Sequence, residues 1–116
     1  MKLSELVTGI EAVAVCGEQG LAEKEVAGAY VSDLLSDVMG RAKEGEVWLT
    51  IQTHPNVVAV AVLLNLAAII FTAGHEPEEQ TKAKAEEEGI ILLKTALSTY
   101  ETAGRIYQLL TGAGRA

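Results

Sequence analysis

The stretch Val47-Trp-Leu-Thr-Ile-Gln-Thr53 predicts a central β-strand, because its side chains would alternate between the two faces of a pleated sheet. Pro55 fits the first position of a helix, where a missing N–H costs nothing, and the apolar run after it extends to about Leu66. A second apolar run, Ile69-Ile-Phe-Thr72, ends before Gly74 and predicts another strand. Strand, helix and strand on short connections indicate a βαβ crossover between parallel strands.

The rest of the chain continues this alternation in both directions. Before the central stretch we expect one helical turn at residues 4–8, strands at Val13–Cys16 and 26–31, and a helix from Ser32 to Gly45 with a buried stripe of Leu34, Leu35, Val38 and Met39. After it we expect a charged helix at 76–88 opened by Pro77, a strand at 90–93, and a helix at 98–110 behind the capping box Ser98-Thr-Tyr-Glu101. Residues 111–116 should fray.

These elements together predict an α/β fold, a three-layer α/β/α arrangement with a mainly parallel sheet of about five strands. A length of 116 residues suits one domain, and no repeat or linker divides it. Aromatic residues make up only 4% of the chain, so the core must consist of Ala, Val, Leu and Ile.

Charge and cysteine content narrow the classes of function. The net charge of −7 repels phosphate backbones, which disfavours nucleic acid as a partner. Residues 57–71 are the most apolar stretch, but Asn65 interrupts them and they are shorter than the roughly 20 residues of a membrane span, so no membrane contact is expected. Cys16 is the one cysteine and cannot form an intrachain disulfide, which favours a reducing, cytoplasmic location and a buried structural thiol.

Two segments of the sequence resemble a known family. The run Val26-Ala-Gly-Ala-Tyr-Val-Ser-Asp-Leu-Leu-Ser-Asp-Val38 and the later run Glu46-Val-Trp-Leu-Thr-Ile-Gln-Thr-His-Pro-Asn56 resemble the DRTGG domain family, over about residues 1–110. That family is similar to the N-terminal domain of bacterial HPr kinase/phosphorylase, and it also occurs beside CBS domains in inorganic pyrophosphatases and within long phosphotransacetylases.

The resemblance implies an HPr kinase N-terminal-domain-like fold and a regulatory or ligand-sensing accessory domain, commonly dimeric, over residues 1–116. The tract that names the family is reduced here to Val26-Ala27-Gly28-Ala29, so Gly28 is the residue that can be matched to it. Kinase chemistry would need a Gly-rich loop ending in Gly-Lys-Ser/Thr, and the sequence has none. We therefore expect no enzyme activity and no cofactor.

Ligands of such sheets lie beyond the carboxyl ends of the strands, where helix N-termini converge. Three segments follow predicted strands and carry polar residues there. If these strands are neighbours, one shallow crevice would be rimmed by Thr53, His54, Asn56, Thr72, His75 and Thr95. The crevice would suit a small anion or a nucleotide, held by helix N–H groups, hydroxyls and imidazoles.

Other interpretations of the same residues remain open. Thr53 and Ser98 are good helix caps with or without a ligand. His54, His75 and Asp33 could hold a metal, although no metal-binding spacing occurs and none is expected. A small enzyme acting on a phosphorylated or acyl compound would use His54 as general base, assisted by Thr53 or Asp33.

The helix at residues 55–66 is apolar on nearly all sides, more than one sheet-facing stripe requires. The surplus predicts a homodimer through this helix, with the closing helix and its Tyr100, Ile106, Tyr107 and Leu110 as the alternative face. The leading hypothesis is a non-catalytic homodimeric module that binds a small anionic ligand or a partner enzyme domain. A purely structural dimerisation module is the alternative.

Overall fold

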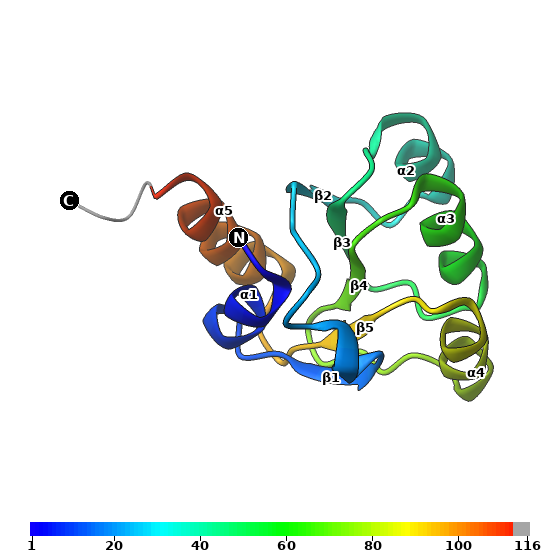
Figure 1. Ribbon diagram of the computed structural model, residues 1–116. Helices are drawn as coiled ribbons and strands as arrows, with labels where there is room; N and C mark the ends of the chain where they lie inside the picture. Colours follow the sequence, from blue (N-terminus) through cyan, green and yellow to red (C-terminus); the bar gives the residue numbers. More distant parts are fainter. Residues whose placement is uncertain (113–116) are drawn as a thin grey trace.

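Strands and helices alternate along the chain and produce a five-stranded sheet between two layers of helices (Figure 1). The computed structural model describes residues 1–112. The elements are, in order, α1 (Leu3–Gly9), β1 (Val13–Cys16), the 3₁₀ turn η1 (Glu18–Gly20), β2 (Gly28–Val31), α2 (Leu35–Arg41), β3 (Glu46–Thr50), α3 (Asn56–Leu64), β4 (Ala68–Phe71), α4 (Glu79–Glu88), β5 (Leu92–Lys94) and α5 (Thr99–Thr111).

The strand order is β1-β5-β4-β3-β2. The strands from β2 to β5 are parallel to their neighbours, with Val47 opposite Ala68 and Ile69 opposite Leu92. Among the strands within residues 1–112, the edge strand β1 alone runs antiparallel, against β5. The predicted α/β class and the mainly parallel sheet are therefore confirmed.

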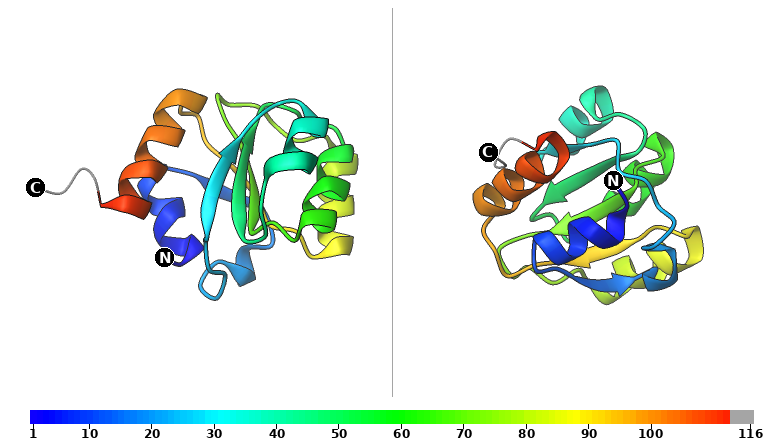
Figure 2. Two further views of the ribbon diagram at one scale, coloured as in Figure 1. Left: turned by 90° about the horizontal axis from the view of Figure 1, so that it is seen from above. Right: turned by 60° about the vertical axis from the view of Figure 1, so that its left-hand side comes forward.

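Helices cover both faces of the sheet, as Figure 2 shows from above: α1 and α5 lie on one side, and α2, α3 and α4 lie on the other. Each face has its own cluster of buried aliphatic side chains. All four residues of β4 are buried, and Ile70 faces one cluster while Ile69 and Phe71 face the other. The core therefore consists of two layers of buried side chains, one on each face of the central strands.

Three helices begin later in the chain than the sequence suggested. Pro55 is the N-cap of α3 rather than its first residue, and His54 accepts bonds from the next two amides, Asn56 N–H through its ring and Val57 N–H through its carbonyl. The backbone of Glu78 is extended and starts α4 at Glu79 instead of residue 76. In α2, the Ser32 hydroxyl accepts the Leu34 amide, and the helix follows at Leu35.

The expected apolar stripe of α2 was wrong. Leu34 and Met39 are 63% and 48% exposed, while Val38 is fully buried. The helix packs with Leu35, Val38 and Ala42, which are three and four residues apart and so lie on one face.

The boundaries of the short elements also differ. The turn at residues 4–8 is the helix α1, β2 omits residues 26–27, and β5 begins two residues later than expected and includes Lys94. Thr111 is still helical, Gly112 is the left-handed C-cap, and residues 113–116 of the predicted frayed tail lie outside the described residues.

Tyr30 of β2 donates a hydrogen bond from its hydroxyl to Asp37 of α2, at 2.7 Å. This bond holds the pKa of Asp37 below its usual value, with smaller contributions from Ser32 and Arg41. A carboxyl group whose pKa falls on folding stabilises the fold above its unfolded pKa, and this stability is lost as the pH falls through the folded pKa.

Tyr30→Phe should therefore raise the pKa of Asp37 and move acid unfolding to a higher pH. NMR titration of the Asp37 carboxyl carbon and acid denaturation followed by circular dichroism measure the two effects. Tyr100→Phe is the matched control, because Tyr100 is 91% exposed. An unchanged Asp37 titration in Tyr30→Phe would contradict the assignment.

Candidate functional site

The parallel arrangement from β2 to β5 brings the carboxyl ends of four strands to one edge of the sheet. The segments that follow β3, β4 and β5 carry all six residues of the predicted crevice: Thr53, His54, Asn56, Thr72, His75 and Thr95. Gly28 lies elsewhere, since it begins β2 opposite Glu46, at the amino ends of the parallel strands. The Glu46 carboxylate lies close to Gly28, since its Oε2 atom would be 3.1 Å from a Cβ added at that glycine.

Thr53 joins two of these segments. Its carbonyl accepts a hydrogen bond from the Glu78 amide at 3.3 Å and another from the Thr81 hydroxyl at 2.6 Å. Thr81 is fully buried in the first turn of α4. The segment after β3 is therefore fixed against the start of α4, beside the segment that follows β4.

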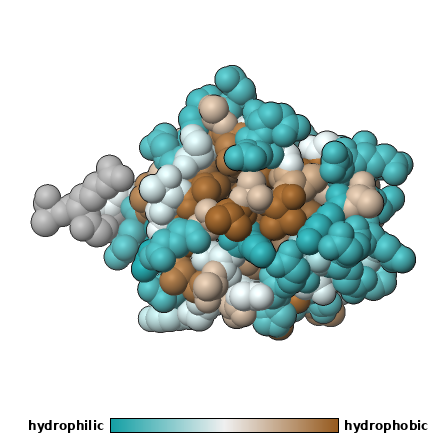
Figure 3. All heavy atoms as spheres, turned by 90° about the horizontal axis from the view of Figure 1, so that it is seen from below, coloured by the Kyte–Doolittle hydropathy of each residue, from teal (hydrophilic) through white to brown (hydrophobic). Residues whose placement is uncertain are grey.

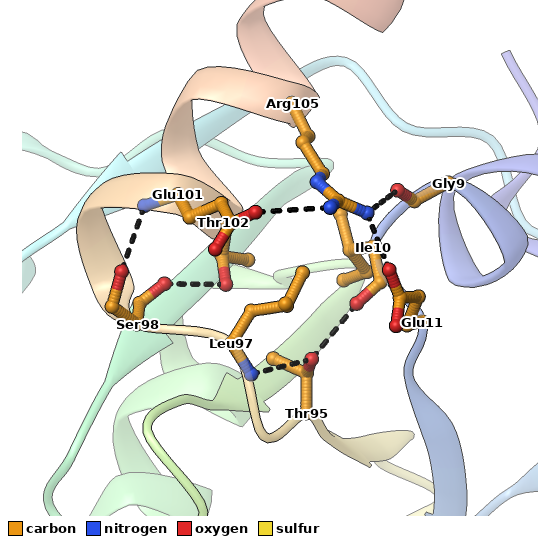
Figure 4. Close-up of polar contacts among 9 residues, drawn as sticks. All are labelled: Gly9, Ile10, Glu11, Thr95, Leu97, Ser98, Glu101, Thr102 and Arg105. Atoms are coloured by element: carbon orange, nitrogen blue, oxygen red, sulfur yellow. Dashed lines mark hydrogen bonds and ion pairs between the residues drawn. The ribbon is translucent and has the colours of Figure 1, made fainter.

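Two of the predicted ligand residues, Thr72 and Thr95, form hydrogen bonds within the domain. Thr72 is fully buried, and its hydroxyl lies 2.5 Å from the hydroxyl of Thr99. Thr95 is 3% exposed, donates from its hydroxyl to the Ile10 carbonyl at 2.8 Å, and accepts the Leu97 amide at 3.2 Å (Figure 4). Both hydroxyls hold the sheet to the segments at its edge.

Arg105 completes this junction between α5 and the end of α1. Figure 4 shows its guanidinium between the Gly9 carbonyl, Glu11 and Glu101, and the ion pairs measure 2.8 Å and 2.9 Å. Hydrogen bonding to Glu11, then to Glu101, raises the pKa of Arg105 above its ordinary value. Ser98 caps α5 as predicted, but Glu101 turns to Arg105 instead of completing the capping box.

The exposed members of the predicted set are His54, Asn56 and His75. The Nδ1 atom of His54 accepts the Asn56 amide at 3.2 Å. The Nδ1 atom of His75 lies 2.9 Å from the Thr72 carbonyl, to which it can only donate. Each ring is thus oriented by the backbone through Nδ1, and Nε2 is the nitrogen left to meet a ligand.

A hollow of about 310 Å³ opens at this edge, but it differs from the expected crevice. Its lining consists of Glu11, Val13, Gly74, Lys94, Thr95 and Ala96. Thr95 is the one predicted residue in it, and residues 53–56 are outside it. The six predicted residues therefore do not all line this hollow, which lies between β1 and the end of β5.

Asp33 and the charged side chains around α4 are the polar groups whose roles the sequence did not reveal. Asp33 Oδ1 accepts the Thr50 hydroxyl and the Ile51 amide, at 2.7 Å and 2.8 Å, and so closes the end of β3. Glu76 binds both Lys94 and Lys82, and hydrogen bonding to Lys94 in particular lowers its pKa. Neither arrangement leaves a signal in sequence spacing, since the partners come from different elements.

A larger hollow of about 410 Å³ lies at the opposite edge, beyond the end of β1 and the end of α4. Its lining includes Cys16, Gly17, Gly20, Glu86 and Gly89. Burial, together with the charge of Glu86, raises the pKa of the Cys16 thiol, which opposes thiolate chemistry there. The sequence predicted a buried thiol at Cys16, but the side chain is only half-buried because it lies at this hollow, which the sequence did not indicate.

Within residues 1–112, no three His, Cys, Asp or Glu side chains come together as metal ligands, so His54, His75 and Asp33 do not assemble into the site considered above. In the same part of the chain, no helix has the length and apolar content that a membrane crossing requires.

Comparison with known proteins decides the family. The family model described as DRTGG domain matches residues 5–109. The chain belongs to the DRTGG domain family. No curated protein matches the chain. The sequence-based identification of a DRTGG domain is thereby confirmed.

A solved structure supports the fold of this DRTGG domain. It contains the CBS and DRTGG domains of the regulatory region of Clostridium perfringens pyrophosphatase, in complex with the activator diadenosine tetraphosphate. The TM-score is 0.69 at 17% sequence identity, and the match covers 92% of this chain and 46% of that chain. The chain thus spans less than half of the pyrophosphatase region that it resembles.

Thr95→Val should destabilise the domain by about 1–3 kcal/mol, because it leaves the buried Ile10 carbonyl and the Leu97 amide without the hydroxyl while keeping the side-chain volume. Urea denaturation measures the change. Thr95→Ser keeps the hydroxyl and should cost only the about 0.5–1.5 kcal/mol of one lost methyl group. Equal stability of Thr95→Val and the wild type would mean that the hydroxyl has no structural role.

Proposed function

We propose that this DRTGG domain is a non-catalytic regulatory module that works as a homodimer. It binds a small anionic ligand, such as a nucleotide, or a partner enzyme domain at the carboxyl edge of its sheet. The family supports the regulatory role, since the similar pyrophosphatase structure places a DRTGG domain in a regulatory region beside CBS domains.

The two hydrogen bonds that the Thr53 carbonyl accepts, from the Glu78 amide and the Thr81 hydroxyl, are the observation that carries the ligand proposal. They fix residues 51–56 against the start of α4, at the ends of the paired strands β3 and β4. His54, Asn56 and His75 are exposed on these two segments, with their backbone positions fixed by hydrogen bonds. Ligands of parallel α/β sheets favour this location.

The acidic side chains of the same edge limit where an anion can bind. Glu76, Glu78 and Glu79 are exposed around the start of α4. The start of α3 carries no acidic residue in its first turn, and a helix N-terminus favours negative charge. The proposed contact is therefore His54 and Asn56 at α3, with His75 alongside.

The state of His54 supports a binding role over catalysis. A general base needs a free nitrogen directed at the substrate and a second polar group that orients the ring. In the described residues the orienting partner is the Asn56 amide, which donates to Nδ1, while the Asp33 carboxylate is engaged with Thr50 and Ile51. The Asp33 carboxylate, one of the two assisting groups in the enzyme hypothesis, therefore has other partners.

A ligand panel tests the binding proposal. Thermal unfolding is measured with ATP, ADP, diadenosine tetraphosphate and inorganic phosphate, and a ligand at 100 times its dissociation constant should add about 2.7 kcal/mol of stability. His54→Ala should remove at least half of that gain, because the imidazole is part of the proposed contact. Gln108→Ala is the control, since Gln108 is exposed on α5, away from the start of α3.

A full ligand effect in His54→Ala would place the binding elsewhere on the domain. The absence of any stabilisation across the panel would remove the ligand from the proposal. The module would then act through its contacts with a second copy or a partner domain alone.

A further inference from the structure

We propose that the hollow beside the end of β1 is a second binding site, which takes a small zwitterion, an aliphatic α-amino acid, between the Lys24 ammonium and the Glu86 carboxylate. The site lies at the amino end of β5, whereas the ligand edge of the proposed function follows the carboxyl ends of β3 and β4. The inference therefore goes beyond that function and concerns a different part of the surface.

The hollow is formed by segments that lie far apart in the sequence. Its lining comes from the end of β1 and the turn η1, from the last turn of α4, and from the isoleucines that precede β5. Its volume is about 410 Å³. Ligand pockets usually measure roughly 300–1,000 Å³, so this one suits a small molecule.

Two glycines let the turn after β1 pack closely against Ile91. Gly17 has a φ of 79°, and a Cβ added to it would lie 2.9 Å from Ile91 Cγ1. A Cβ added at Gly20 would lie 3.2 Å from Ile91 Cδ1. At Gly89, the C-cap of α4, no atom of residues 1–112 would lie within 4 Å of an added Cβ. The hollow therefore has an aliphatic wall at Ile91 and open space at Gly89.

Opposite charges line the hollow without pairing with each other. Lys24 forms no ion pair within residues 1–112, and neither do the carboxylates of Glu18 and Glu86. In the smaller hollow, by contrast, both charged side chains are bound to partners. The larger hollow therefore offers a ligand charges of both signs that no other described group neutralises.

The backbone is fixed at both charges. The Lys24 amide donates to the Gly20 carbonyl at 3.1 Å, and the Lys24 carbonyl accepts the Leu3 amide at 2.8 Å. Glu86 lies in the last turn of α4, where its carbonyl accepts the Gly89 amide at 3.4 Å. Binding therefore has to order two side chains and little backbone, which lowers its entropic cost.

Cys16 shows that the charge of Glu86 acts inside the hollow. Burial raises the pKa of the Cys16 thiol, and the charge of Glu86 raises it further. A carboxylate that opposes a negative charge at this place favours a positive one, such as an ammonium group. The ammonium group of the ligand is therefore assigned to Glu86, and its carboxylate to Lys24.

The mixed lining disfavours other classes of small ligand. A nucleotide would bring several negative charges against Glu18 and Glu86. A simple amine would leave the Lys24 ammonium without a partner, and an uncharged apolar compound would cover the charges and bring a partner to neither. A zwitterion with an aliphatic side chain satisfies both charges and the apolar wall of Ile90 and Ile91.

Figure 3 shows the molecule from the side on which β1 and α4 lie in Figure 1. Apolar residues gather across the middle of this face, and hydrophilic residues surround them. Apolar surface and charge are thus available close together, as a ligand with one apolar group and two charges requires.

Titration with L-leucine tests the site, because two close analogues each lack one of its charges. Isopentylamine has no carboxylate, and isocaproate has no ammonium group. Isothermal titration calorimetry should show saturable binding of L-leucine. Each analogue should bind at least about tenfold more weakly, which is the factor that corresponds to one hydrogen bond to a charged group.

Charge variants separate the two contacts. Lys24→Gln should weaken L-leucine about tenfold and leave isopentylamine unchanged, since the amine has no carboxylate for Lys24. Glu86→Gln should weaken L-leucine by a similar factor without weakening isocaproate. Lys43→Gln and Glu87→Gln are the controls and should bind L-leucine as the wild type does, because both side chains are exposed and neither lines the hollow. Thermal unfolding checks that every variant folds.

NMR of the unmodified protein locates the ligand without any substitution. The amide signals of Gly17, Gly20 and Gly89 should shift on addition of L-leucine, because these glycines line the hollow. The signals of Gly40 and Gly104 should stay unchanged, because neither residue belongs to the lining.

Three results would overturn the proposal. The first is the absence of saturable L-leucine binding, which leaves the ligand edge of the proposed function untouched, since the nucleotide panel tests that edge separately. The second is a shift of the amide signals of residues 53–56 in place of the three glycines, which would put the amino acid at the carboxyl edge. The third is wild-type affinity for L-leucine in both Lys24→Gln and Glu86→Gln.

Discussion

Two-sided burial of the central strands is the constraint on which the structure depends. The residues of β4 are buried on both faces, and Val47, Trp48 and Leu49 of β3 are equally inaccessible. Strands covered on both faces need a helix in each connection, and helical crossovers make neighbouring strands parallel. Parallel strands end at the same edge, so the aliphatic core itself decides where the polar connecting segments gather.

The antiparallel β1 makes the two outer strands of the sheet different, because β2 at the other side runs parallel to its neighbour. Its start lies next to the end of β5, where Thr95 and Arg105 bind the chain that leaves α1. The Thr95 hydroxyl and the Arg105 guanidinium thereby hold α1 and α5 in place. β1 is also the last strand at one side of the sheet that residues 1–112 form.

The fold was largely predictable because it follows from the apolar pattern. The runs at residues 47–53 and 69–72, with a helix between them, were sufficient for the βαβ unit. Helix starts were less predictable: Pro55 is the N-cap of α3 rather than its first residue, and Glu76 binds Lys94 of β5 instead of beginning α4. The six candidate residues do follow the carboxyl ends of β3, β4 and β5, but the sequence could not show that the hydroxyls of Thr72 and Thr95 are buried and bonded.

Trp48 is the one tryptophan of the chain and is fully buried, with its indole N–H donating to the Ser32 carbonyl at 2.8 Å. It packs with the side chains of α2 and α3, on the face of β3 away from α1 and α5. Its fluorescence is therefore an intrinsic optical signal for one layer of the molecule. Loosening of α2 and α3 would shift that emission, whereas changes confined to α1 and α5 would leave it nearly constant.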